Sequence, residues 1–155
     1  MGAKLGMLAK LYRLSTGTRA AWPVSGAPAN LVELGNVRDV TLNLQTGEAD
    51  VTTRANNGWK ATIATLKDGS IEFEMIWDPS DGGFSALKDA YFNNSIIALA
   101  VLDGAKDVVG SQGLWADFTV TNLSREEPLE EAIKAKVTLK PTYSAVSPAW
   151  VTVAA

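Results

Sequence analysis

Carboxylates, lysine, tyrosine and Ser-Lys pairs are the only groups that could carry catalysis in this chain, because it contains no histidine and no cysteine. The lack of cysteine excludes disulfides, thiol nucleophiles and cysteine-ligated metals. The lack of histidine excludes Ser-His-Asp and Cys-His catalysis and nearly every transition-metal enzyme site. We therefore expect a protein that is not an enzyme, with no catalytic residue, no cofactor and no metal ligand.

Two groups of carboxylates are the remaining candidates for acid–base chemistry. Glu72 and Glu74 share one face of a predicted strand. A second cluster precedes a lysine-rich strand and comprises Glu126, Glu127, Glu130 and Glu131. Paired carboxylates can hydrolyse glycosides when they flank the bond. The simpler interpretation is a solvated strand face and an acidic strand entry, cross-paired with Lys134 and Lys136.

Two other patterns suggest ligands only weakly. Residues 78–83 are acidic and glycine-rich, but Gly82 stands at position 5, where a calcium loop needs an oxygen ligand. Five tryptophans suggest a carbohydrate-binding surface, although tryptophan is also common in cores and interfaces. They lie in or beside predicted strands: Trp22, Trp59, Trp77, Trp115 and Trp150. A sugar-binding sandwich therefore stays a minor alternative.

The charge balance argues against a protein that grips nucleic acid. The 155 residues, enough for one domain with its own core, include 14 basic and 17 acidic side chains, a net charge of −3. Phosphate binding needs a basic surface, which this chain lacks. A weakly acidic protein could instead let a polyanion pass without holding it, provided that acidic groups face the path.

Targeting signals are not evident. No apolar run approaches the ~20 residues of a membrane helix, so membrane binding is not expected. Lys10 and Arg13 interrupt the apolar start, whereas a signal peptide needs about 7–15 unbroken apolar residues. The protein is therefore expected to be made and kept in a cytoplasm until something releases it.

Alternation of apolar and polar residues predicts mostly β-structure. For example, Val40, Leu42 and Leu44 predict a half-buried strand, and turns are expected at Thr46-Gly47 and Asp68-Gly69. The expected strands are 39–45, 48–53, 59–66, 71–75, 95–102, 114–121 and 131–140, with 150–153 either a last strand or an ordered tail. Residues 95–102 are apolar on both faces, which predicts a strand covered on each side.

One helix is predicted after Pro79, which cannot continue a strand ladder. Ser80 or Asp81 can cap its start. Its apolar stripe comprises Phe84, Leu87, Ala90 and Tyr91, and the helix ends at Asn93-Asn94. One helix within a long series of strands predicts a mainly β fold, either a β-sandwich or a rolled half-barrel with one flanking α-helix.

The polar segment 52–58 is long for a hairpin connection and contains an Asn-Gly step. It is either a mobile surface loop or an arm that contacts another copy and becomes ordered on assembly. The residues assigned to this contact are Asp50, Thr52, Thr53, Arg54, Asn56 and Asn57.

An ordered series of segments carries a resemblance to a known family. The series is 31–44, 50–54, 58–62, 66–74, 77–79, 86–92, 96–100, 113–122, 124–131 and 137–142. Together these segments resemble the tail tube (major tail) proteins of long-tailed bacteriophages. The likeness extends over about residues 10–142, and the series of segments, rather than any single motif, is specific.

The resemblance implies hexameric rings that stack into a tube, with strands of neighbouring subunits joined into a β-barrel that lines the channel for the genome. It implies a tail tube domain over 10–142 with an extended loop at about 46–58 that links rings, an N-terminal arm over 1–9 and a C-terminal tail over 143–155. The implied partners are tape-measure protein and DNA in the lumen, and tail terminator and tail tip proteins. The implied location is the virion tail, assembled in the host bacterial cytoplasm.

Related injection machines share this fold and form the main alternative. They include the inner tube of a contractile tail, a phage-derived bacteriocin, a gene transfer agent and a type VI secretion tube. Sequence alone separates these poorly, and a neighbouring sheath gene would indicate contraction.

Overall fold

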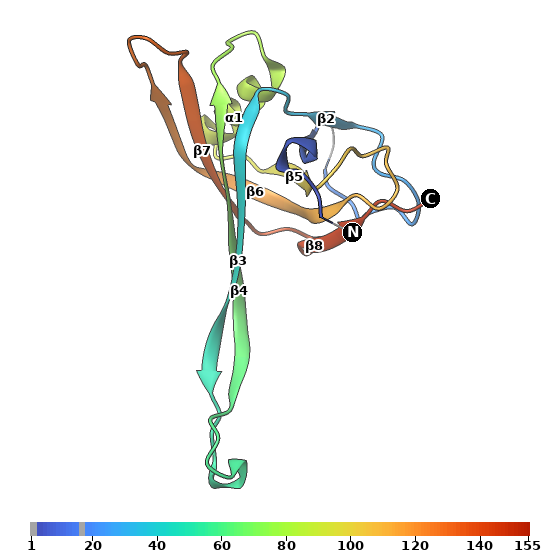
Figure 1. Ribbon diagram of the computed structural model, residues 1–155, viewed down its shortest axis with the longest axis vertical. Coiled ribbons are helices and arrows are strands. Elements are labelled where there is room, and N and C mark those ends of the chain that lie inside the picture. The colour runs from blue at the N-terminus through green and yellow to red at the C-terminus, as the bar shows by residue number, and fades with distance from the viewer. Residues whose placement is uncertain (1–2, 16–17) are drawn as a thin grey trace.

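The computed structural model of the chain describes residues 3–15 and 18–155. Eight strands form one antiparallel sheet in the order β2-β1-β5-β6-β7-β4-β3, and β8 pairs with the beginning of β6 (Figure 1). The strands are β1 (Lys10–Leu14), β2 (Leu31–Glu33), β3 (Val37–Asp50), β4 (Thr62–Ile76), β5 (Ile97–Leu102), β6 (Gln112–Glu126), β7 (Lys134–Pro141) and β8 (Ala149–Thr152). One α-helix, α1 (Gly82–Phe92), and two 3-10 turns, η1 (Gly6–Leu8) and η2 (Arg54–Asn56), complete it. The mainly β fold with one helix is confirmed, and a single sheet favours the rolled architecture over the sandwich.

Both faces of the sheet are buried where β1, β5 and β6 meet. On one face, Phe84 and Leu87 of α1 join a core cluster with Leu99 and Phe118. On the other face, Trp115 heads a second cluster with Tyr12, Leu31, Ala98, Ala100, Leu102, Val151 and Val153. The prediction that 95–102 is covered on each side is therefore confirmed for 97–102, because alternate residues enter different clusters, whereas Ser95 and Ile96 are exposed.

The helix begins as the sequence predicts. Asp81 caps it by accepting a hydrogen bond from the Phe84 amide at 3.2 Å. Phe84, Leu87 and Ala90 are buried, whereas Tyr91, predicted in the same stripe, stays 39% exposed. None of the described helices is long and apolar enough to cross a membrane.

The two turns expected at Thr46-Gly47 and Asp68-Gly69 are wrong. Both sites lie inside long strands, so β3 and β4 form one hairpin instead of two short ones. A β-bulge lies near Gly47, where the register shifts between the pairs Thr46–Lys67 and Glu48–Ala64. Gly69 pairs with Leu44, whose side chain packs over the glycine. A Cβ at position 69 would lie only 3.0 Å from Leu44 Cδ2. These glycines serve a bulge and a close contact, not a reversal of the chain.

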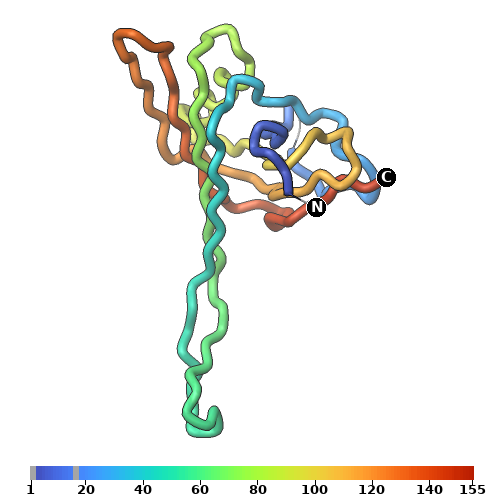
Figure 2. The backbone as a smooth tube through the Cα atoms, viewed as in Figure 1, coloured from blue at the N-terminus to red at the C-terminus, as the bar shows by residue number. Residues whose placement is uncertain are grey.

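This hairpin extends well beyond the rest of the molecule, as the backbone trace shows (Figure 2). Near the body, β4 pairs with β7 over residues 71–76. Beyond that point, residues 43–50 pair only with β4, over a length of about 25 Å at the usual rise of a strand. We call residues 43–70 the arm and the remaining described residues the body.

Candidate assembly interface

The arm is exposed along nearly its whole length. Residues 43–68 are exposed except for Ala49, Asn56 and Ala61, which are half-buried. Residues 46–50 of the predicted loop continue β3, so the connection itself comprises residues 51–61. A two-stranded ribbon of this kind is marginal in water unless it packs on something else. The arm is therefore a surface that lacks its packing partner within the subunit.

The tip of the arm is a hydrogen-bonded structure. The Asp50 carboxylate accepts a hydrogen bond from the Thr52 amide at 2.8 Å, and the Thr53 amide donates to Asn56 Oδ1 at 2.6 Å. The Ala61 amide donates to the Thr52 hydroxyl at 2.9 Å, which connects the two sides of the tip. Asn57 has φ 55°, the left-handed conformation that asparagine tolerates.

The six residues assigned from the sequence therefore lie together at one place. Four of them, Asp50, Thr52, Thr53 and Asn56, use their side chains to fold the tip. The Thr52 hydroxyl, and then its amide, lowers the pKa of Asp50 below its ordinary range. Of the six, Arg54, the first residue of η2, is an exposed charged side chain that is free to contact another molecule.

Apolar side chains on the arm are the part of this surface that sequence reasoning missed. Trp59 is 79% exposed, Leu66 86%, Leu44 56% and Ile63 54%. The sequence predicts a strand over 59–66, but no core of the subunit covers its apolar residues. The signal that could have revealed them is the length of the hairpin, which the two expected turns obscured.

The sheet also has free edges on either side of one four-stranded part. Among the described residues, β3 pairs with β4 alone, and residues 119–126 of β6 pair with β7 alone. Both edges display unpaired backbone N–H and C=O groups, which invite pairing with another chain. Exposed edges and an exposed apolar arm are features of a subunit that completes its structure by association.

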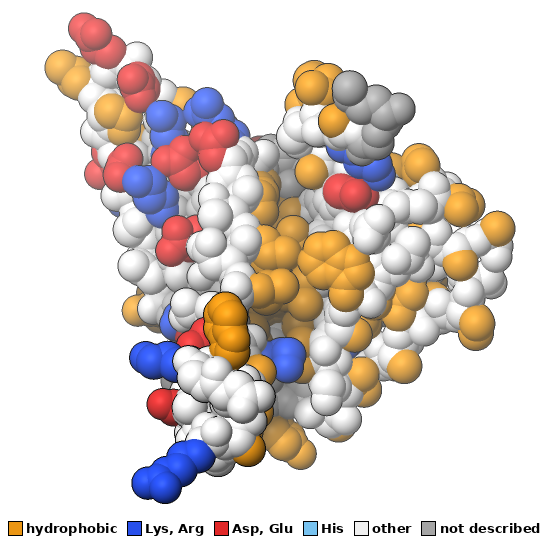
Figure 3. Space-filling view, turned by 60° about the horizontal axis from the view of Figure 1, so that its bottom comes forward, with side chains coloured by type: hydrophobic (Ala, Val, Ile, Leu, Met, Phe, Trp, Pro, Cys, Tyr) orange, Lys and Arg blue, Asp and Glu red, His pale blue; other side chains and the backbone are white. Residues whose placement is uncertain are grey.

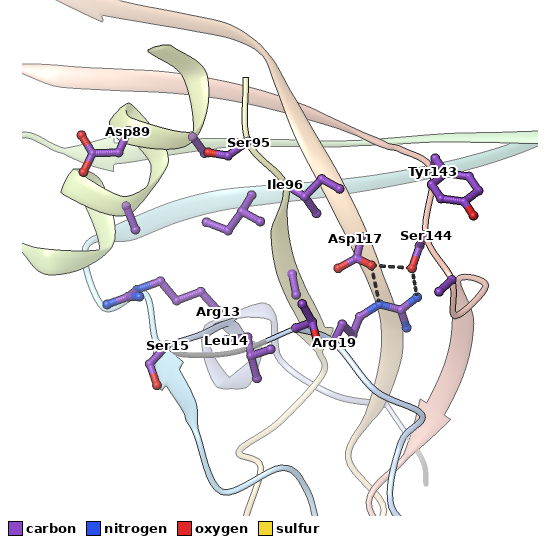
Figure 4. A pocket seen from close by; sticks show the side chains of 16 residues that line it. Arg13, Leu14, Ser15, Arg19, Asp89, Ser95, Ile96, Asp117, Tyr143 and Ser144 are labelled. Carbon is purple, nitrogen blue, oxygen red and sulfur yellow. Dashed lines mark hydrogen bonds and ion pairs between the residues drawn. The ribbon is translucent and has the colours of Figure 1, made fainter. Parts of the chain in front are cut away.

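A buried ion pair lies inside the body, beside a cavity of about 530 Å³. Figure 4 shows the side chains that line this cavity. The buried Arg19 side chain bonds to Ser144 and to the Val146 carbonyl, and its Nε lies 3.4 Å from Asp117 Oδ2 in an ion pair. The guanidinium also stacks over the Trp115 ring, 5.5 Å from its centroid. These contacts fasten two loops to β6.

The charged groups around this cavity do not converge on a common point. Arg13 lies at the opposite end from the Arg19–Asp117 pair (Figure 4). A hydrolytic or transfer site needs an acid, a base or a nucleophile directed at the same atom. Among the described residues, the Arg19–Asp117 pair at this cavity is a structural joint.

Four of the six carboxylates considered from the sequence, Glu74, Glu126, Glu127 and Glu131, have ion-pair partners. Lys136 Nζ lies 3.8 Å from Glu74 Oε1 and 3.7 Å from Glu126 Oε1, and Lys134 pairs with Glu131 at 3.2 Å. The predicted cross-pairing is confirmed for Lys136, whereas Lys134 pairs with Glu131 three residues earlier in the chain. No cluster that could hold a metal ion occurs in residues 3–15 and 18–155.

A rolled antiparallel sheet with one helix, free edges and a projecting apolar arm is the architecture of a β-protein whose surfaces suit association. The family model described as phage tail tube protein matches residues 10–142. The chain therefore belongs to the phage tail tube protein family. A search of the curated proteins found no match.

Solved structures share the fold at low sequence identity. The virion of a native gene transfer agent contains a chain with 11% identity and a TM-score of 0.68, covering 96% of this chain and 99% of that one. The tail of the empty gene transfer agent particle, refined with C6 symmetry, gives 13% identity and 0.68, covering 98% and 100%. The SPP1 tail tube gives 15% identity and 0.63, covering 99% and 81%.

Proposed function

We propose that this chain is the repeating subunit of a tube whose hexameric rings stack to form a conduit for DNA. The observation that carries the proposal is the arm, with Trp59, Ile63 and Leu66 exposed on a hairpin that contacts little of its own body. Exposure of several large apolar side chains on one projection is costly unless a partner covers them. Stacked copies of the same chain would supply that partner.

Lateral closure of the ring would use the two free edges. The strands β6, β7, β4 and β3 alternate in direction, since every neighbouring pair among them is antiparallel. Because their number is even, β3 of one copy would lie antiparallel to β6 of the next in a head-to-tail ring. Six copies would then give about 24 strands, above the roughly 16–18 strands that already leave an aqueous channel.

Axial stacking would use the arm. The contact residues are the six assigned from the sequence, Asp50, Thr52, Thr53, Arg54, Asn56 and Asn57, together with the apolar residues of the arm. In this division residues 10–142 form the tube domain, and 1–9 form an N-terminal arm whose Leu5, Met7 and Leu8 are exposed. A head-to-tail contact that does not close on itself generates an open filament.

The C-terminal tail, 143–155, supports the subunit rather than the stack. Its strand β8 pairs with the beginning of β6, and the Gly26 amide donates to the Ala154 carbonyl at 2.8 Å. Val151 and Val153 enter the second core cluster. This segment would therefore stay with its own body during assembly.

The proposed role is structural, without catalysis and without a cofactor. The subunit would assemble in the cytoplasm of a host bacterium and end in the virion tail. Tape-measure protein and DNA would occupy the channel in turn, and terminator and tip proteins would close its ends. The lack of histidine and cysteine and the divergent side chains of the body cavity support this interpretation.

The tube of another injection machine is the second candidate. Its support is the likeness to gene transfer agent tails and to the baseplate structure of an anti-feeding prophage, the latter at 8% identity and a TM-score of 0.56. The same subunit geometry would serve either role. A sheath gene beside this one would favour a contractile machine.

Electron microscopy of the purified protein tests the proposal. The informative variant replaces residues 47–66 with Asn-Gly, so that the Thr46–Lys67 pair closes a two-residue hairpin turn. The wild-type chain should form tubes, and the shortened chain should fold but stop at single subunits or rings. Undiminished tubes from the shortened chain would show that the arm does not link rings, and a strictly monomeric wild type at high concentration would contradict the proposed function.

A further inference from the structure

One face of the four strands β6, β7, β4 and β3 is polar and bare. Residues that lie opposite one another in register form rows across it, such as Arg38, Glu74, Lys136 and Ser124, or Thr41, Glu72, Thr138 and Asn122. Lys134, Lys140, Asp68 and Glu126 continue the same alternation. We call this set the polar face.

The opposite face of the same strands belongs to the core. Ile71, Phe73 and Met75 alternate with the polar residues of β4, and all three are at most 3% exposed. They belong to the cluster that contains Phe84 and Leu87 of α1. The body's bulk therefore lies on one side of these strands, and the polar face lies on the other.

The polar face is also hollowed. A depression of about 460 Å³ lies on it, with Asp39, Thr41 and Glu72 on one side and Asn122, Ser124 and Lys136 on the other. When subunits close into a ring, the side of each sheet that carries the core and α1 needs more space and therefore lies at the outer circumference. The polar side, which carries no further layer, then faces the axis of the ring. Strand closure by edges β3 and β6 would thus direct the polar face inward.

The lysines of this face are held by carboxylates. Lys136 lies between Glu74 and Glu126, and Lys140 Nζ is 3.8 Å from Asp68 Oδ2. Lys134 is paired with Glu131. Over the part of the body formed by β6 and β7, Figure 3 shows blue and red side chains intermingled.

We propose that the polar face is the wall of the tube's channel and that its carboxylates occupy the β7 lysines, so that duplex DNA slides past without being held. This inference rests on the proposed tube function. A phosphate would have to displace two carboxylates to reach Lys136. The acidic lining expected from the sequence is thereby replaced by one of paired charges of both signs.

Cysteine accessibility tests where the polar face lies, because the chain has no cysteine of its own. Ser124→Cys places one thiol on the polar face, and Ser95→Cys makes the same exchange at an exposed site beside α1. In assembled tubes, Ser124→Cys should react with N-ethylmaleimide, which can diffuse along a channel, and lose its reaction with a bulky polyethylene glycol maleimide. Dissociated subunits of both variants should react with both reagents.

Other outcomes overturn the placement. Reaction of Ser124→Cys tubes with the bulky reagent would put the polar face outside, and exclusion of both reagents would put it in a subunit interface. If Ser95→Cys also loses its reaction with the bulky reagent in tubes, the site beside α1 is not on the outer surface. That result contradicts an outward position for α1. Failure of the wild type to form tubes is a separate result that contradicts the proposed function itself.

The charge claim is tested by Glu74→Gln/Glu126→Gln, matched in net charge by Asp89→Asn/Asp107→Asn at exposed body sites. Tubes are assembled with a short DNA duplex and sedimented. Six freed lysines per ring should retain duplex at 50 mM salt, with affinity falling about 10³-fold by 200 mM. Wild-type and control tubes should retain none; retention by the control, or none by the Glu74/Glu126 variant, contradicts the inference.

Discussion

The two halves of the β3–β4 hairpin have similar residues and opposite surroundings. In the body half, Ile71 and Phe73 are at most 3% exposed, because β7 and the core cluster cover them. In the arm half, Ile63 and Leu66 are 54% and 86% exposed. The same strand therefore stabilises the subunit at one end and, in our account, stabilises the assembly at the other. What differs is the partner each half has, not its residue types.

The largest expected loss in the free energy of unfolding comes from a substitution in the body half of the hairpin. Phe73→Ala should lower the free energy of unfolding by about 3–5 kcal/mol, because it removes a buried ring and leaves a cavity. Chemical denaturation of the disassembled subunit measures this. A loss below about 1 kcal/mol, typical of surface sites, would contradict the division between body and arm.

The internal joint of the body should be nearly as sensitive. Arg19→Met leaves the largely buried Asp117 without its ion-pair partner, so we expect a loss of about 3 kcal/mol. Adding Asp117→Leu should recover part of that loss, since the unpaired charge is then removed. A double variant no more stable than Arg19→Met would show that the joint does not act through its charges.

The tip should respond locally and more weakly. Gly58 has φ +82°, so Gly58→Val should destabilise the tip by roughly 1–2 kcal/mol without changing the unfolding of the body. Hydrogen exchange of the Trp59 amide, which donates to the Asn56 carbonyl, should become faster. Gly35→Val, at an open site without positive φ, is the control and should leave that amide unchanged. Equal effects from both substitutions would count against a structured tip.

The smallest expected effect is the loss of tip stability when the pH is lowered. The Thr52 hydroxyl and amide lower the folded-state pKa of Asp50, so this contribution to the tip is complete above the carboxyl's ordinary pKa. It is lost as pH falls through the lowered value. NMR titration of the Asp50 carboxyl should show the depressed pKa, and Thr52→Ala should return it toward the ordinary range. An Asp50 pKa that Thr52→Ala leaves unchanged would disprove the contact.

The body could be predicted from sequence because its alternation is directly tied to burial. Leu114, Ala116, Phe118 and Val120 are predicted on one face of a strand, and all four are in the core cluster. The alternation predicted for residues 131–140 is also confirmed, since Ala135, Val137 and Leu139 are buried. Strands β1 and β2 were missed because their short segments carry too little pattern.

The arm could not be predicted in the same way. Gly47 and Asp68-Gly69 have the residue types of turns, and only long-range pairing shows that one accommodates a bulge and the other a close contact. Apolar residues at 59–66 follow the same alternation whether a core or a second copy covers them. The sequence places the proposed contact residues at the tip, whereas the exposed apolar side chains of the arm depend on the three-dimensional arrangement.

The most direct test compares folding with assembly in one variant, Ile63→Ala/Leu66→Ala. Our account predicts that its free energy of unfolding as a disassembled subunit stays within about 0.5 kcal/mol of wild type, as for exposed sites. The critical concentration for tube formation, measured by sedimentation, should rise by about tenfold for each 1.4 kcal/mol by which the substitutions weaken subunit association. A destabilised subunit with an unchanged critical concentration would contradict the account.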